Sequence, residues 1–336
     1  MSNKKLITGT IFFIIGAGLF WYVYQDINIQ SIKDVLKELK YSWIFLSVIL
    51  GLISTLVRAI RWKMLIESMG YKPKTLNLFL SVQILYFINL VIPRGGELAR
   101  CGMIAKYEKI PFVKLLGTVF VERLTDFISF IFIFIGVFFL QFSFIKKIFS
   151  TLKISPSGFQ SKILIFSLVA TLFILLYWLF KRIGLLKRFQ NKINKIKEEI
   201  KEGIKSILLI EKKWTYIFLT FLIFLMWLLE LYVVFFAYTP TYNMTLPAAI
   251  FTYTIGTLAF LLPIQAGIGV WHFLVMESLN LFGLDKDFGK MFALVAHTFT
   301  NLVYLIFGTV GFIIIPLINN KSHVKPDKSI NSTKTR

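Results

Sequence analysis

The chain has 336 residues, of which 57% are hydrophobic and only 16% charged, and its mean hydropathy is +0.73. Soluble domains carry about 25% charged residues, so this composition excludes an ordinary soluble protein and indicates a polytopic integral membrane protein. The net charge of +21 comes from lysines and arginines that collect beside apolar runs. That placement is typical of loops facing anionic lipid head groups, and we expect no nucleic-acid partner. The single cysteine, Cys101, excludes an internal disulfide and a thiolate zinc site.

Six apolar stretches are long enough to cross a bilayer, which takes about 20 residues. They lie at residues 6–24, 42–62, 115–140, 162–180, 214–238 and 289–317. The first stretch follows Lys4 and Lys5, and no small-residue cleavage site follows it. We therefore expect a retained span there instead of a signal peptide.

Two further apolar stretches are short and end at a proline. Residues 76–92 end at Pro93, and residues 246–262 end at Pro263. A glycine-containing amphipathic segment follows each of them, at residues 94–105 and 265–283. A proline stops a helix, so each pair of segments is predicted to form a broken helical hairpin.

The charges in the loops predict how these segments are oriented. Basic residues flank segment 76–105 on both sides, and Arg58 and Arg61 belong to the basic end that precedes it. The positive-inside rule then places both flanks in the cytoplasm and makes the segment a re-entrant hairpin. The linker 181–213 and the C-terminal tail are also basic, which leaves 246–283 as a second hairpin entering from the opposite face. Both termini are predicted to be cytoplasmic.

This order of segments predicts an inverted repeat. One unit covers residues 42–140 and the other residues 214–317, and each consists of a span, a proline-broken hairpin and a second span. Inverted repeats whose broken helices meet at mid-membrane are typical of transporters; the alternative is that any two proline-interrupted helices look alike. The predicted fold is an all-α polytopic membrane protein with about six spans and two re-entrant helical hairpins, in a single transmembrane domain over residues 1–320.

Two polar regions complete the predicted organisation. Over residues 183–210, isoleucines, leucine and phenylalanine recur every three or four positions with lysines between them, which predicts an amphipathic linker helix on the cytoplasmic leaflet. Residues 321–336 form a basic, polar tail that is predicted to be disordered and cytoplasmic.

Charged residues lie beside the first hairpin, where each unpaired charge would cost about 2.5–3.5 kcal/mol. They are Arg94, Glu97, Arg100, Glu122, Arg123 and Asp126. The first three share a face if 94–105 is helical, and Glu122 and Asp126 share another, so three arginines are expected to balance three carboxylates. Two interpretations stay open: a closed ion-pair network that fixes the hairpin, or a polar cavity in which arginines bind a phosphate and carboxylates meet an amine.

The second half carries fewer charges. Its candidate cavity residues are Glu230, Gly267, Gly269, His272, Glu277 and His297. Glu230 lies well inside a span and is either a proton-coupling residue or a hydrogen-bonded structural one. The two histidines are expected to pack or donate hydrogen bonds more often than to bind ligands. The two glycines are expected to allow a tight turn and a close backbone approach.

No catalytic signature is present in the sequence. A Walker-type phosphate loop, a His-Glu-x-x-His zinc motif and a Gly-x-Ser-x-Gly nucleophile elbow are all missing. We therefore expect a protein that is not an enzyme and needs no cofactor or metal.

Four segments resemble one known family. They are RAIRWKMLI at 58–66, IPRGGELAR at 92–100, VERLTDF at 121–127 and LPIQAGIGVWHF at 262–273. They resemble the membrane domain of lysylphosphatidylglycerol synthetases and its stand-alone flippase-like relatives, over about residues 5–318. The last segment departs from the family, which usually has Gly-Val-Arg-Glu or Gly-Val-x-Glu where this chain reads Gly-Val-Trp-His. His297 also stands where an arginine is common.

The resemblance implies a lipid flippase of a bacterial-type cytoplasmic membrane that moves an amphiphilic phospholipid, such as an aminoacylated one, between leaflets. The aminoacyl-transferase domain of the full synthetase is absent, so we expect no lysyl transfer. Some relatives act beside glycosyltransferases, and the alternative is a membrane partner of an enzyme that uses polyprenyl-phosphate-linked sugars. An aminoacyl-lipid synthase is a further candidate partner. A non-transporting scaffold is the third hypothesis, and the sequence does not give the oligomeric state.

Overall fold

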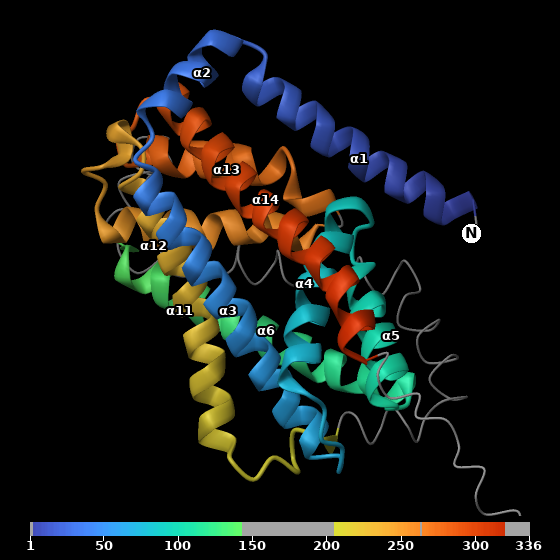
Figure 1. The fold of residues 1–336 in the computed structure, drawn as a ribbon. Coiled ribbons are helices and arrows are strands. Elements are labelled where there is room, and N and C mark those ends of the chain that lie inside the picture. The colour runs from blue at the N-terminus through green and yellow to red at the C-terminus, as the bar shows by residue number, and fades with distance from the viewer. Residues whose placement is uncertain (1–2, 143–204, 263, 320–336) are drawn as a thin grey trace, which may run out of the picture.

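The computed structural model describes residues 3–142, 205–262 and 264–319, and within these ranges the chain is helical and contains no β-strand. Figure 1 shows the arrangement. In chain order the elements are α1 (Asn3–Tyr24), α2 (Ile29–Glu38), α3 (Tyr41–Glu67), α4 (Thr75–Val91), α5 (Gly96–Glu108), α6 (Phe112–Leu140), α11 (Lys213–Phe235), η1 (Thr239–Thr241), α12 (Leu246–Thr257), η2 (Leu258–Leu261), η3 (Gln265–Gly267), α13 (Val270–Leu281) and α14 (Lys286–Asn319).

Four helices of the described ranges are long and apolar enough to cross a membrane: α3, α6, α11 and α14. They cover the predicted spans 42–62, 115–140, 214–238 and 289–317. The predicted first span falls on α1, whose described apolar part is shorter, Ile14–Tyr24. The predicted span 162–180 and the tail 321–336 lie outside the described residues. Most of the predicted linker helix 183–210 does too, and its described end, residues 206–209, forms a turn.

The first proline-broken hairpin consists of α4 and α5. Helix α4 ends at Val91, and the chain turns at Pro93 before α5 begins at Gly96. A Cβ atom at Gly96 would lie only 2.1 Å from the carbonyl oxygen of Leu85, and the Gly96 N–H donates to the Asn89 side chain at 3.0 Å. Glycine at this position therefore lets α5 pack directly on the backbone of α4.

The second hairpin is more irregular. Helix α12 continues into the 3-10 turns η2 and η3, and α13 begins after Gly269. Gly267 and Gly269 both have positive φ, +71° and +81°, and a Cβ atom at Gly269 would lie 2.0 Å from the carbonyl oxygen of Gly16 in α1. The tight turn and the close backbone approach expected at these glycines are confirmed, and the neighbour is the first helix.

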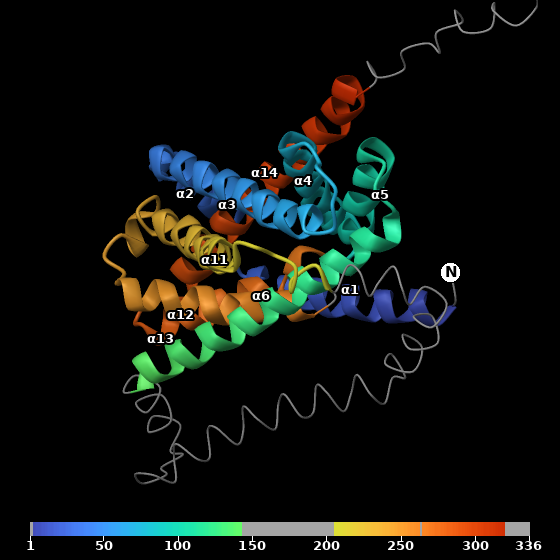
Figure 2. The same cartoon turned by 90° about the horizontal axis from the view of Figure 1, so that it is seen from below.

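Elements of the two halves pack in pairs. Helix α3 runs antiparallel beside α11, because Ser47 contacts Glu230 near one end and Arg61 contacts Thr220 near the other. Helix α4 packs against α14, and α14 in turn packs against α13. Figure 2 shows α3 and α11 side by side, with α6 crossing beneath them. The α3–α11 and α4–α14 pairs each place a helix from before residue 143 against one from after residue 204.

Candidate functional site

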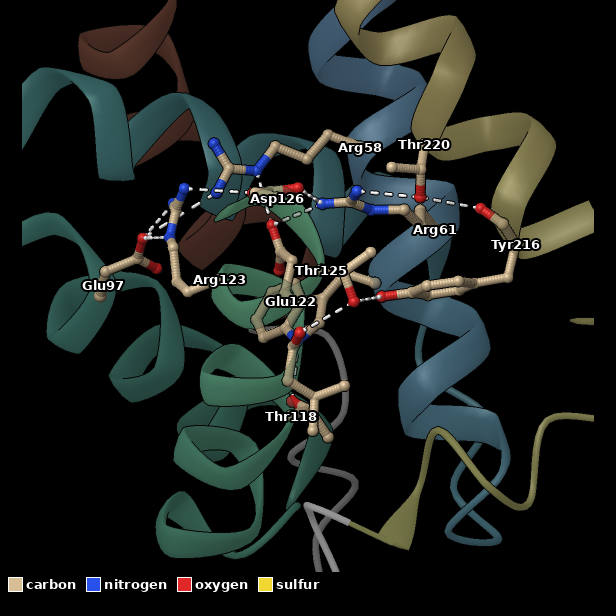
Figure 3. A network of polar contacts seen from close by, with 12 residues as sticks. Arg58, Arg61, Glu97, Thr118, Glu122, Arg123, Thr125, Asp126, Tyr216 and Thr220 are labelled. Carbon is tan, nitrogen blue, oxygen red and sulfur yellow. Dashed lines mark hydrogen bonds and ion pairs between the residues drawn. The ribbon is translucent and has the colours of Figure 1, made fainter. Parts of the chain in front are cut away.

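Seven charged side chains from three helices converge inside the helix assembly, and Figure 3 labels all of them except Arg100. We call this set the charge cluster; it consists of Arg58, Arg61, Glu97, Arg100, Glu122, Arg123 and Asp126. Helix α3 supplies the first two, α5 supplies Glu97 and Arg100, and α6 supplies the last three. The broken hairpin is what brings α5 between the long helices α3 and α6.

Glu122 is the centre of the buried part of the cluster. Its Oε1 accepts a hydrogen bond from Nε of Arg58 at 2.7 Å, and its Oε2 accepts one from Nη2 of Arg100 at 2.8 Å. Nη2 of Arg61 lies 3.5 Å from Oε1. A carboxylate removed from water needs such partners to remain charged. Three arginines thus surround one carboxylate.

Glu97 and Asp126 form the outer part of the cluster, with Arg123 between them. Arg123 donates to Glu97 through Nε at 2.6 Å and also through Nη2, and its Nη1 lies 3.4 Å from Oδ2 of Asp126. Asp126 also accepts from Nη2 of Arg61 at 2.6 Å, and Glu97 lies 2.8 Å from Nε of Arg100. Each outer carboxylate therefore joins Arg123 to an arginine of the buried part.

Uncharged groups hold the arginine planes in place. Nη1 of Arg58 donates to the hydroxyl of Tyr86 at 2.6 Å, and Nη1 of Arg61 donates to Thr220 of α11 at 3.1 Å. The Arg100 guanidinium lies over the ring of Trp62, 4.3 Å from its centroid. Stacking of this kind suits the planar guanidinium and would not suit a lysine.

Exposure changes from one end of the cluster to the other. The side chains of Arg61, Arg100 and Glu122 are 0% exposed, whereas Arg123 is 41% exposed. Glu97 and Asp126, beside Arg123, are 20% and 13% exposed. A molecule approaching from outside would meet Arg123 and its two carboxylates first.

The cluster carries a surplus of positive charge. Four arginines stand against three carboxylates, which gives a formal charge of +1. Within the described residues, Nη2 of Arg58, Nε of Arg61 and Nη1 of Arg100 are buried without a hydrogen-bond partner. The predicted balance of three against three was wrong, because Arg58 and Arg61 join the cluster and Arg94 does not pair with its carboxylates.

Arg94 is the predicted cluster residue that the structure places elsewhere. It precedes α5, has a φ of 60°, and is exposed. Its Nη2 donates to the carbonyl oxygen of Leu261 at 2.8 Å, which joins the first hairpin to the second. Arg94 was predicted to share a helix face with Glu97 and Arg100. It does not, because residue 94 lies before the start of α5.

Sequence reasoning missed Arg58 and Arg61 as site residues. Further basic residues follow them in the sequence, which suggested the cytoplasmic end of a span. Both are instead buried within α3, at 1% and 0% exposure. One signal in the sequence was available. The two arginines lie three residues apart, on one helix face, with Trp62 beside them, and apolar residues resume after Lys63 and continue to Ile66.

The candidate residues of the second half do not form one site. Glu277 pairs with Lys286 at 2.7 Å on an exposed surface. Glu230 is half-buried in α11; its Oε1 accepts from Thr300 at 3.3 Å, and no ion pair with a described residue is present. His272 and His297 pack against each other, with ring centroids 4.4 Å apart.

The two histidines line an open cavity of about 440 Å³ between α1, α4, α13 and α14. Thr298 and Asn301 are its other polar lining residues, and the rest of the lining is apolar. Nε2 of His297 lies 2.9 Å from the carbonyl oxygen of Ala266, so it donates there, and Nδ1 accepts from Asn301 at 2.9 Å. In the part of the chain that the structure describes, no group of three histidine, cysteine or carboxylate side chains could hold a metal ion.

Comparisons with known proteins agree with this architecture. The family described as the lysylphosphatidylglycerol synthase TM region matches residues 8–308, which is most of the chain. The UPF0104 membrane protein MJ1595 of Methanocaldococcus jannaschii is 26% identical over 338 residues, covering 94% of this chain and 97% of that protein. No solved structure matches the chain.

Proposed function

The chain belongs to the lysylphosphatidylglycerol synthase TM-region family, and from that premise we propose that it is a lipid flippase. It moves an amphiphilic phospholipid, including aminoacylated phospholipids, between the two leaflets without covalent chemistry of its own. The observation that carries this proposal is the charge cluster, which lies among apolar helices, has a formal charge of +1 and is accessible at one end.

Arg123 is the proposed contact for the lipid phosphate. It is the most exposed arginine of the cluster, and its present partners are carboxylates, which a phosphate oxygen resembles as an acceptor. A phosphate that displaces Glu97 or Asp126 from Arg123 would leave that carboxylate free to meet an amine of an aminoacylated head group. Arg58, Arg61 and Arg100 hold the carboxylates from the buried side.

The path of the lipid follows from the two hairpins. Arg94 joins the tip of the first hairpin to Leu261 in the second, and the cavity beside His272 and His297 lies next to this junction, with Leu90 in its lining. The acyl chains would stay in the bilayer against the apolar lining, while the head group passes the polar groups. A route of this kind keeps charged atoms out of the hydrocarbon.

The inverted repeat remains part of the proposal. It is supported by the antiparallel packing of α3 on α11 and by the packing of α4 on α14. In such a transporter, the two halves open alternately to the two leaflets. The proposed location is a cytoplasmic membrane with both termini in the cytoplasm, as the distribution of basic residues predicts.

Lipid movement in proteoliposomes tests the proposal. Purified protein is reconstituted with fluorescent phosphatidylglycerol, lysyl-phosphatidylglycerol or a polyprenyl phosphate, and dithionite quenching reports the label in the outer leaflet. We expect wild-type protein to equilibrate one of these lipids, and the Arg123→Gln variant to do so at least about tenfold more slowly if one charge-assisted contact is lost.

The matched control is Lys286→Gln, which removes a half-exposed cation paired with one carboxylate far from the cluster. It should leave the rate unchanged. Folded wild-type protein that moves none of the three lipids would overturn the flippase proposal and favour the membrane partner of a glycosyltransferase or aminoacyl-lipid synthase. Glycosyltransferases captured with the protein would then be assayed with polyprenyl-phosphate sugars.

A further inference from the structure

Glu230 is a carboxylate in the helix core that the charge cluster does not use. It lies on α11 against Gly51 of α3, where an added Cβ would come within 3.1 Å of its Oε1. Its Oε1 accepts a hydrogen bond from the hydroxyl of Thr300 in α14, at 3.3 Å. Among the described residues, no lysine, arginine or histidine forms an ion pair with it. The glycine thus makes room for a carboxylate that has no cation beside it.

Three tyrosines, Tyr86, Tyr253 and Tyr304, lie on helices that pack around Glu230 and the charge cluster. The hydroxyl oxygen of Tyr253, on α12, is buried and meets no partner at hydrogen-bonding geometry in the described ranges. Tyr304 stacks on Tyr86 with ring centroids 4.4 Å apart and planes 9° apart. The Tyr86 hydroxyl in turn accepts from Arg58. Helix α14 thus carries both Thr300, which donates to Glu230, and Tyr304, which stacks on the tyrosine bound by Arg58.

The distance between the two regions is short enough for their charges to interact. Gly51 and Arg58 are seven residues apart on α3, which is two turns, on one face and about 10 Å along the axis. In a medium of low dielectric constant, charges at that separation still influence each other. The ionisation of Glu230 therefore changes the electrostatic potential at the cluster.

The other polar side chains near Glu230, such as His297, already have hydrogen-bond partners of their own. His297 is one turn before Thr300, but both of its ring nitrogens are occupied by Ala266 and Asn301. Ser47 donates to the backbone oxygen of Glu230. The groups that face the carboxylate or lie on the way to the cluster are Ser47 and Arg58 on α3, Tyr86 on α4, Asp126 on α6, Tyr253 on α12, and His297, Thr300 and Tyr304 on α14.

The summed formal charge of the cluster and Glu230 links the state of one region to that of the other. The cluster has a formal charge of +1, and an ionised Glu230 reduces the total to zero. A phosphodiester head group with one negative charge would also reduce it to zero. Both anions together would leave a net negative charge in a region of low dielectric constant, which is costly. Binding of the lipid anion and ionisation of Glu230 therefore oppose each other.

We propose that Glu230 is a proton-binding site, and that one proton is taken up on its carboxylate when a singly anionic phospholipid head group binds the charge cluster. The proton comes from water, forms the O–H bond of the neutral acid, and returns to water when the lipid leaves. The movement of the lipid is then coupled to protons. This inference rests on the proposed function, because it requires that the cluster binds a lipid anion.

Calorimetry in two buffers measures such uptake directly. Short-chain phosphatidylglycerol is titrated into detergent-solubilised full-length protein in Tris and in HEPES, whose ionisation enthalpies differ, so the difference in heat gives the protons bound. We expect about one proton per lipid for wild type, and an affinity that falls with rising pH by up to about tenfold per pH unit. Short-chain phosphatidylcholine, whose head group has no net charge, should bind without proton uptake.

Two variants separate Glu230 from other carboxylates. Glu230→Gln should bind phosphatidylglycerol with no proton uptake and no pH dependence, whereas Glu277→Gln, which removes an exposed carboxylate, should behave like wild type. Wild-type binding without proton uptake would overturn the coupling while leaving the flippase proposal intact, and this readout does not depend on the folding of any variant. Uptake that persists in Glu230→Gln would also overturn it. Absence of lipid binding by folded wild-type protein would remove both proposals.

Discussion

Nε of Arg58 and Oε1 of Glu122 lie 2.7 Å apart, and the two side chains are 2% and 0% exposed. This pair joins α3 to α6 through a bond between charges that have almost no contact with solvent. Such a bond is worth little relative to a well-packed apolar pair, yet the loss of one partner leaves an uncompensated buried charge. The stability of the helix assembly should therefore depend on Glu122 more than on the outer carboxylates.

The Glu122→Gln variant should lose about 3–5 kcal/mol of unfolding free energy, because Arg58, Arg61 and Arg100 all lose their shared counter-charge. Thermal unfolding in detergent, followed by tryptophan fluorescence, measures the change. The matched variant Asp126→Asn removes a carboxylate that is partly exposed and should cost less. Equal melting temperatures for Glu122→Gln and wild type would show that the buried part of the cluster is not structural.

Neutral replacement of an outer pair separates transport from scaffolding. The double variant Arg123→Gln with Glu97→Gln removes one charge of each sign from the accessible end of the cluster. We expect a smaller loss of stability than in Glu122→Gln, because Arg123 is partly exposed and Arg100, which loses Glu97, still has Glu122 as a partner. Lipid movement in proteoliposomes should be lost, because the phosphate contact is gone. A double variant that moves lipid at the wild-type rate would show that Arg123 does not bind the phosphate, and the outer end of the cluster would then have only a structural role.

The glycine at the start of α5 provides a test of the hairpin. Gly96→Ala would place a Cβ 2.1 Å from the Leu85 carbonyl oxygen, so α5 must move away from α4. We expect a destabilisation of about 1–3 kcal/mol, as for overpacked cores. Gly102→Ala, on the same helix, meets no atom within 4 Å and should be neutral or gain up to about 1 kcal/mol from helix propensity. Urea unfolding curves for the two variants should therefore shift in different directions.

Cys101 allows the cluster to be monitored chemically. It is the single cysteine of the chain, follows Arg100 and is completely buried. A buried thiol without solvent contact reacts slowly, so a maleimide should label folded protein only after denaturant is added. Glu122→Gln, which loosens the packing of α5 on α6, should increase the labelling rate. Rapid labelling of native wild-type protein would contradict the position of this side chain.

Much of the helix pattern could be predicted from the sequence, because it depends on local properties. The lengths of the apolar runs predicted the long helices α3, α6, α11 and α14. Pro93 predicted the break between α4 and α5. The glycines before α13 were expected to permit a close approach, and they do. The partner in that contact, Gly16, was not predictable, since it lies in a helix more than 200 residues earlier in the chain.

The membership of the charge cluster was only partly predictable. Five members of the cluster were predicted, because each lies in or beside an apolar run; they are Glu97, Arg100, Glu122, Arg123 and Asp126. Arg58 and Arg61 were assigned to a cytoplasmic end, since a basic residue near the end of a span is ambiguous until the packing of α5, α6 and α11 around it is known. Arg94 was predicted to lie in the helix with Glu97 and Arg100. Its backbone is left-handed instead, and an arginine in the sequence does not indicate that conformation.

The hydrogen bond from Arg94 to Leu261 has a consequence for how the protein can change by mutation. Its acceptor is a backbone carbonyl, which every residue type supplies, so substitution at position 261 leaves the acceptor in place. Its donor is a guanidinium, which one amino acid supplies. The link between the two hairpins therefore tolerates substitution at position 261 and is lost when Arg94 is replaced by a residue without a guanidinium.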